Sequence, residues 1–130
     1  MNALFTRNTG KKLESLRFKL VDAVDDGMHK ALIWANDQMK FSLVCDRGYY
    51  DSYIEPIDIA EHYMDIIWLL RFIKKNSEFY EKELELAGLS NTLPPEEYVD
   101  LLYANYNLIA DFMKSFKEED YLAFKKFPNN

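Results

Sequence analysis

Residues 41–56, FSLVCDRGYYDSYIEP, decide the fold class, because two strand-like runs flank a turn that ends in glycine. From residue 38 to 45, apolar and polar side chains alternate, and a period of two is typical of a β-strand. The apolar face of this run consists of Met39, Phe41, Leu43 and Cys45. The second run is rich in tyrosine and isoleucine and ends at Pro56, which has no amide hydrogen to donate to a sheet. The stretch predicts an antiparallel hairpin over residues 38 to 57.

The tip of this hairpin is the triplet Asp46, Arg47 and Gly48. A three-residue hairpin loop is commonly a type I turn followed by a glycine in the left-handed region, and the order of these residues fits that loop. We therefore predict a structural turn with Gly48 at positive φ, in preference to a ligand-binding or catalytic role for Asp46 or Arg47.

A further strand is predicted just upstream of the hairpin. The short apolar run at residues 31–34 is followed by an Asn-Asp turn, which favours a three-stranded antiparallel meander over residues 30–57. The second interpretation is a single helix over residues 28–45. We rank it lower, because the alternating pattern and the glycine-tipped loop both favour strands.

Helical periodicity flanks this meander on both sides. Apolar residues recur at intervals of three and four from Leu13 to Val24, which predicts a helix over residues 10–26 that ends at Gly27. After the hairpin, Asp58 is a suitable N-cap for a largely apolar central helix. This central helix is predicted over residues 58–75, and later helices are predicted over residues 77–87, 95–116 and 118–126. The predicted fold class is α+β in one domain, with an N-terminal helix, a short three-stranded antiparallel meander and three to four helices packed on the sheet.

Composition fits an ordinary domain in a reducing compartment. The chain has 130 residues, 48% of them hydrophobic, which supplies enough core without a metal or a disulfide. Cys45 is the single cysteine and permits no internal disulfide. Residues 1–12 show no secretory signal, and the apolar run at residues 66–73 is too short to cross a bilayer core of about 30 Å. We expect a cytoplasmic protein that does not enter the membrane.

Signals for an enzyme are few. Asp58, Glu61, His62 and Asp65 would share one face of the predicted helix, a spacing that could present metal ligands. A carboxylate-bridged metal site in a helix bundle also needs a second Glu-x-x-His motif, which the chain lacks, so a solvated helix face is preferred. No glycine-rich phosphate loop, Cys-x-x-Cys motif or nucleophile elbow occurs. We expect no catalytic residue, no metal and no cofactor, and keep a small metal-binding enzyme as an alternative.

Charge is unevenly distributed along the chain. Residues 1–57 hold eight basic and eight acidic residues, whereas residues 58–130 hold eight basic and fourteen acidic ones, which is the whole net charge of −6. Such acidity either keeps the protein soluble or attracts a basic protein, and it disfavours nucleic acid, whose phosphates need a basic stripe. The candidate partner-binding residues are acidic helix residues and two strand tyrosines: Glu78, Glu81, Glu85, Glu96, Glu97, Asp100, Tyr49 and Tyr53.

The layout resembles the small immunity proteins that are encoded beside bacterial polymorphic toxins, those of contact-dependent growth inhibition systems in particular. The resemblance is carried by the N-terminal helix, the Asp46-Arg47-Gly48 tip followed by Tyr49 and Tyr50, and the acidic, aromatic-rich helices. It implies a non-enzymatic protein that binds the C-terminal domain of a cognate toxin, often a nuclease, and blocks its active site or substrate groove. A generic adaptor for a basic protein is a further alternative, and the oligomeric state is left open.

Overall fold

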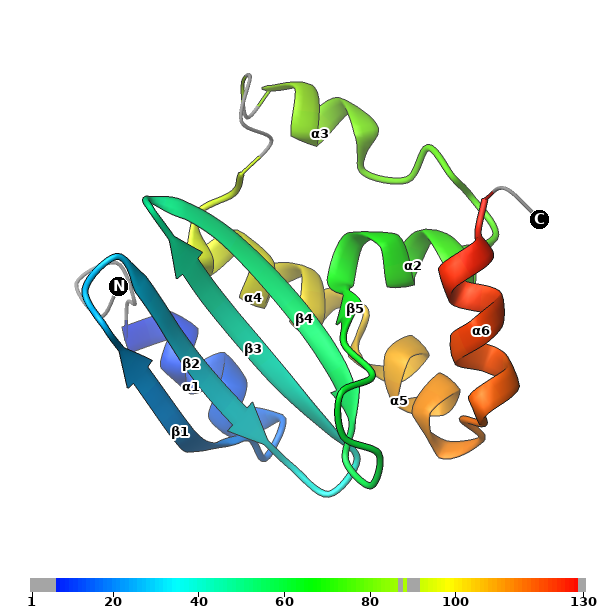
Figure 1. Cartoon of the computed structure of the whole chain (residues 1–130), viewed down its shortest axis with the longest axis horizontal. Helices are drawn as coiled ribbons and strands as arrows, with labels where there is room; N and C mark the ends of the chain where they lie inside the picture. The colour runs from blue at the N-terminus through cyan, green and yellow to red at the C-terminus, as the bar shows by residue number, and fades with distance from the viewer. Residues whose placement is uncertain (1–6, 87, 89–91, 129–130) are drawn as a thin grey trace.

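The computed structural model describes residues 7–86, 88 and 92–128 and has an α+β fold, in which a five-stranded sheet is backed by helices (Figure 1). Every strand pairs antiparallel with its neighbours in chain order, so the sheet is a meander. The strands are β1 (Lys19–Asp25), β2 (His29–Ala35), β3 (Met39–Asp46), β4 (Tyr49–Pro56) and β5 (Met64–Asp65). The helices are α1 (Arg7–Ser15), α2 (Ile66–Lys74), α3 (Glu81–Leu86), α4 (Pro95–Ala104), α5 (Tyr106–Lys114) and α6 (Glu118–Lys126).

The hairpin predicted over residues 38 to 57 is confirmed as β3 and β4. Phe41 lies opposite Ile54 in this pair, and both side chains are fully buried. The alternative of a single helix over residues 28–45 is wrong, because this segment forms β2 and β3. Alternation of apolar and polar residues therefore predicted the centre of the sheet correctly.

The turn between β3 and β4 is shorter than predicted. Only Arg47 and Gly48 separate Asp46 from Tyr49, and they have φ angles of 54° and 89°. Positive φ at both central residues is typical of a type I′ turn, whose twist matches that of the paired strands better than a type I turn does. The prediction of positive φ at Gly48 is confirmed, and the prediction of a three-residue loop is wrong.

The helix predicted over residues 10–26 ends much earlier, at the end of α1. Arg17 adopts a left-handed φ of 67°, and the amide of Phe18 donates to the carbonyl of Leu13 at 3.0 Å. Phe18 is then buried in the core, and the following residues pair with β2 as β1. The valines of β1 favour strands, and pairing with β2 outweighs a helical spacing that continued by chance to Val24.

The central helix begins at Ile66 and not at Asp58. Its N-cap is Asp65, whose carboxylate accepts hydrogen bonds from the amides of Ile67 at 2.9 Å and Trp68 at 3.1 Å. The residues just before the helix form β5, in which Asp65 lies opposite Tyr53 of β4. Both aspartates are good caps by residue type, and the pairing of β5 with β4 decides between them.

The later helices also differ from the prediction. The helix expected over residues 95–116 is divided into α4 and α5 at Asn105, whose side-chain amide donates to the carbonyl of Leu101 at 2.9 Å. Helix α3 is shorter than the predicted 77–87, and position 87 lies outside the described residues. Helix α6 is confirmed. In the described part of the chain there are thus six helices rather than four or five, and five strands rather than three.

The core lies between one face of the sheet and α1, α2, α4 and α5. Figure 1 shows α1 and α4 behind the strands, with α2 and α5 beside β4 and β5. Side chains with no exposed surface come from both layers: Phe41, Leu43, Ile54, Leu69, Leu70, Val99, Leu102 and Ile109. None of the described helices is both long and apolar enough to cross a membrane.

Candidate partner-binding site

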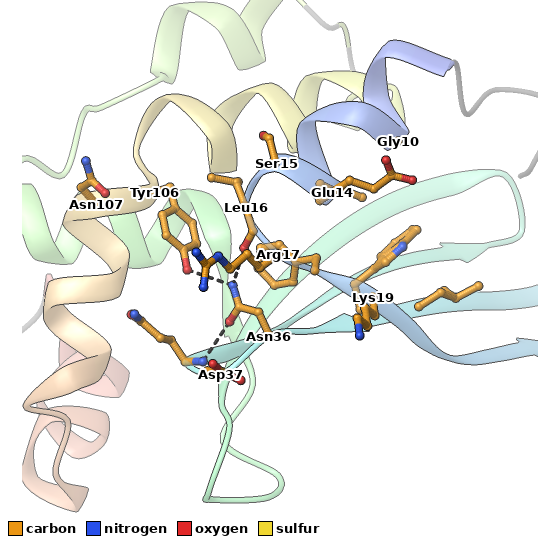
Figure 2. Close-up of a pocket in the computed structure, with 15 residues that line it drawn as sticks. Gly10, Glu14, Ser15, Leu16, Arg17, Lys19, Asn36, Asp37, Tyr106 and Asn107 are labelled. Atoms are coloured by element: carbon orange, nitrogen blue, oxygen red, sulfur yellow. Dashed lines mark hydrogen bonds between the residues drawn. The ribbon is translucent and has the colours of Figure 1, made fainter.

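A first cleft, of about 1180 Å³, lies between the end of α1, the start of β1, the β2–β3 turn and the start of α5 (Figure 2). Four charged side chains line it, and they balance: Glu14 and Asp37 are acidic, and Arg17 and Lys19 are basic. This cleft has no net charge that would select a charged partner.

The central polar side chain of this first cleft, Asn36, is used by the fold itself. The Asn36 side-chain amide donates to the carbonyl of Leu16 at 2.9 Å and to the hydroxyl of Tyr106 at 2.8 Å. Its Oδ1 accepts from the amides of Gln38 at 2.9 Å and Met39 at 3.1 Å. Asn36 thus ties the β2–β3 turn to the end of α1 and to α5, as Figure 2 shows. We therefore assign this cleft a structural role.

A second cleft, of about 860 Å³, lies between α3 and α4, and we call it the acidic cleft. Its polar lining includes Tyr80, Glu83, Glu97 and Asp100, and no lysine, arginine or histidine is among the described residues that line it. Leu86 contributes an apolar edge and is 88% exposed. The acidic cleft combines negative charge with an accessible apolar surface.

The sequence of α4 explains how two of these carboxylates reach the acidic cleft. Pro95 is the first residue of the helix, where its missing amide hydrogen costs nothing, and Glu97 lies in the first turn, near the positive end of the helix dipole. Asp100 follows three residues later and therefore lies on the same side of the helix. Both side chains are exposed and line the acidic cleft.

Tyr80 stands among the carboxylates of the acidic cleft. Burial raises the pKa of its hydroxyl, and the charges of Glu97, Glu83 and Asp100 raise it further. The hydroxyl also donates a hydrogen bond to Glu97. All three carboxylates therefore lie near the Tyr80 hydroxyl, and a cation placed there would be attracted by all of them.

Compensation of this negative charge is incomplete. Lys12 of α1 forms an ion pair with Asp100, and its ammonium also lies 5.7 Å from the centre of the Tyr103 ring. No such pair joins Glu83 or Glu97 to a basic side chain among the residues that the structure describes. Two carboxylates of the acidic cleft are thus left for a cation from outside the chain.

The structure brings together some of the predicted partner-binding residues and separates the others. Glu97 and Asp100 line the acidic cleft, whereas these four glutamates are absent from its lining: Glu78, Glu81, Glu85 and Glu96. Tyr80 and Glu83 were missed by the sequence analysis. Glu83 and Leu86 are three residues apart and share one side of α3, whereas Tyr80 precedes the helix with a φ of 66° and leaves no such signal.

The two predicted tyrosine anchors lie on β4, outside the acidic cleft. Tyr49 is 56% exposed, whereas Tyr53 is half-buried with its ring centre 6.4 Å from that of Tyr63. Between them, the amide of Tyr50 donates to the hydroxyl of Thr92 at 2.6 Å, and Thr92 is part of the acidic-cleft lining. The hairpin tip therefore adjoins the rim of the acidic cleft.

The four residues considered as metal ligands do not share a helical face, because residues 57–63 form a turn. In this turn Glu61 has a φ of 65°, and His62 hydrogen-bonds through Nε2 to Glu118 of α6 at 2.6 Å. The His62 ring also stacks on Tyr121, with ring centres 4.1 Å apart. Asp65 is engaged as the cap of α2. Over residues 7–86, 88 and 92–128, no group of three or more His, Cys, Asp or Glu side chains is arranged to hold a metal ion.

Comparison of the chain with protein-family models, curated proteins and solved structures gives no match. The arrangement of side chains around the acidic cleft is therefore the basis for a functional proposal.

Proposed function

We propose that this chain is a non-enzymatic immunity protein that neutralises a toxin domain by inserting basic side chains of that domain into the acidic cleft. The observation that carries the proposal is the group of three carboxylates around Tyr80, of which only Asp100 has an ion-pair partner among the described residues. The layout of helix, antiparallel meander and acidic helices supports the same class of protein.

Electrostatics explains how this group of carboxylates could inhibit a nuclease. A nuclease holds phosphates in a basic cleft, and an inhibitor that offers fixed carboxylates competes for the same basic side chains. Complementary charge also accelerates association, by a factor of about 10 to 1,000 at low salt. The partly buried position of Tyr80 supplies an aromatic anchor of the kind that is enriched at the centres of interfaces.

The proposal is tested by co-expression with the product of the gene immediately upstream. We expect that product to stop bacterial growth, the full chain to restore growth, and the two proteins to form a complex. The double variant Glu83→Lys with Glu97→Lys should abolish protection and slow association, because it reverses two charges in the acidic cleft. Association rates at two salt concentrations should show a shallower salt dependence for this variant.

The matched control is Glu81→Lys with Glu85→Lys, which makes the same change of charge on α3, the helix that carries Glu83, at positions outside the cleft lining. It should keep protection within about twofold, because exposed charges that do not line the cleft contribute only weakly to a contact inside it. Equal loss of protection in both variants would show that general acidity, and not the acidic cleft, attracts the partner. A complex with an upstream product that is not toxic would instead favour the adaptor alternative.

A further inference from the structure

The face of the sheet that points away from the helices, here called the outer face, is apolar at one end and acidic at the other. Strand register places two rows of residues across it. The first row, from β1 to β4, is Val24, Ala31, Val44 and Asp51. The second row, from β1 to β5, is Asp22, Ile33, Ser42, Tyr53 and Asp65.

The apolar part of the outer face lies on β2 and β3, and β1 contributes both Val24 and the exposed Asp22 beside it. Ile33 and Val44 are half-buried and Val24 is 42% exposed, and none of the three belongs to the hydrophobic core or packs against it. An antiparallel sheet with one solvated face normally presents polar side chains there. Strand β2 instead presents Ala31 and Ile33 there, and β3 adds Val44 beside the polar Ser42.

The acidic end of the outer face is formed by β4, β5 and the end of β3. Asp51 lies diagonally across from Asp46, and both burial and the charge of Asp46 raise the pKa of Asp51. Burial and the charges of Asp51 and Asp65 likewise raise the pKa of Tyr53. Neither Asp46 nor Asp51 forms an ion pair within the described ranges. His29 of β2 lies opposite Asp46 in the strand register, but no ion pair joins the two among the described residues, so the negative charge at this end is unpaired.

Two other basic groups in this part of the fold, Lys40 and Arg71, are engaged elsewhere. Lys40, on the same face one row further along, lies 4.0 Å from the carboxylate of Glu55. The charge of Arg71, on α2, lowers the pKa of Asp65 by less than burial raises it. The Nε atom of Arg71 donates a hydrogen bond to the carbonyl of Phe79 at 2.8 Å. A partner that brings its own cation would satisfy the acidic end better than any of these groups.

We propose that the outer face binds an amphipathic helix of a partner protein, with its apolar side on β2 and β3 and a row of lysine or arginine side chains over Asp46 and Asp51. Charge complementarity selects the basic row, and the apolar strands select the other side of the helix. Four strands spaced about 4.8 Å apart are wide enough for one helix of about 10 Å diameter. A helix here would cover the second apolar face of the sheet, as helices cover the first. This inference goes beyond the proposed function, because it requires neither the acidic cleft nor a toxin.

The test is selection of binders to the full chain from a phage-displayed library of random peptides of about 18 residues, long enough for five helical turns. The selected peptides should carry lysine or arginine on one side of an apolar helical pattern and become helical when bound, as judged by circular dichroism. Asp51→Lys should weaken them at least about tenfold. Val44→Thr keeps a β-branched shape on the outer face and should weaken them several-fold. Glu83→Lys, the same change of charge in the acidic cleft, should alter affinity by less than about twofold.

Several results would overturn the inference. The selected peptides could lack basic residues, or no peptide could be enriched, or Glu83→Lys could reduce binding where Asp51→Lys does not. Concentration-dependent dimers in sedimentation experiments that disappear in Asp51→Lys would show that a second copy of the chain covers the outer face. Circular dichroism of each free variant checks its fold, and because Asp51 is exposed its replacement should leave the fold intact. The protection test with Glu83→Lys and Glu97→Lys does not involve the outer face. Its failure would leave the peptide-binding result unchanged, so the two proposals can fail separately.

Discussion

Replacing Gly48 measures the strain of the two-residue turn between β3 and β4. Gly48 has a φ of 89°, and a Cβ atom built on it meets no other atom within 4 Å. A side chain at this position therefore meets no steric clash. The free energy of unfolding falls only by the cost of the left-handed backbone conformation, which is about 1 to 2 kcal/mol for most residues. We expect the free energy of unfolding to fall by about 0.5 kcal/mol in Gly48→Asn, about 1 in Gly48→Ala and about 2 in Gly48→Val.

The neighbouring residue supplies a control with the opposite sign. Arg47 has a φ of 54°, so Arg47→Asn places a residue that tolerates this region before Gly48 and creates the Asn-Gly pair that type I′ turns prefer. It should raise the free energy of unfolding by up to about 1 kcal/mol. Urea denaturation followed by circular dichroism measures each change, provided that the slope with urea is constant. Equal stability of Gly48→Val and the wild type, or destabilisation by Arg47→Asn, would refute the assignment of the turn.

Three further changes probe the capping aspartate, a buried hydroxyl and the core. Burial raises the pKa of Asp65 above 3.8, so ionisation of this carboxyl destabilises the folded state above that pH. The variant Asp65→Asn keeps an equally good N-cap and should match or exceed the wild type in free energy of unfolding, measured with urea at pH 7. The difference between the two proteins should vanish below pH 3.8. Burial raises the pKa of Tyr98 to about 12, and its hydroxyl donates to the carbonyl of Tyr50 at 3.0 Å. Tyr98→Phe should lower the free energy of unfolding by about 0.5 to 1.5 kcal/mol at pH 7. Between pH 10 and about 12, this variant should lose less free energy of unfolding than the wild type, because only the wild type must keep the Tyr98 hydroxyl protonated to stay folded. Leu102 has no exposed surface, and Leu102→Ala should lower the free energy of unfolding by about 2 to 5 kcal/mol in the same urea assay.

The sheet could be predicted where local pattern and tertiary structure agree. In β3 the alternating side chains are also the ones that the helices bury, so Phe41 and Leu43 carry a signal of period two. In β1 every residue is exposed, so burial imposes no alternation, and Leu20 and Val24 instead continued the spacing of α1. An edge strand of this kind is defined by its pairing with β2, from Asp25 opposite Lys30 to Lys19 opposite Ala35, and not by an alternation in its own side chains.

The acidic cleft could be predicted in part for a similar reason. Glu97 and Asp100 follow from the helix start that Pro95 fixes, because the proline sets which side of α4 each later residue occupies. Helix α3 has only six residues and no buried side chain, so no apolar stripe shows which side faces α4. Tyr80, just before α3, packs against the core and thereby sets the orientation of that helix. That orientation places Glu83, and not Glu81, in the lining of the acidic cleft.

The acidic cleft and the outer face meet at the hairpin tip, which links the two proposals. Tyr50 is bound through its backbone to Thr92 on the rim of the acidic cleft, while the next residue, Asp51, points to the outer face. A partner large enough to occupy both surfaces would have to pass over this tip. If Glu83→Lys and Asp51→Lys each weaken binding of one partner and their effects on binding free energy add, that partner contacts both surfaces independently. If each variant instead weakens a different partner, the chain has two binding sites that share only the β3–β4 hairpin.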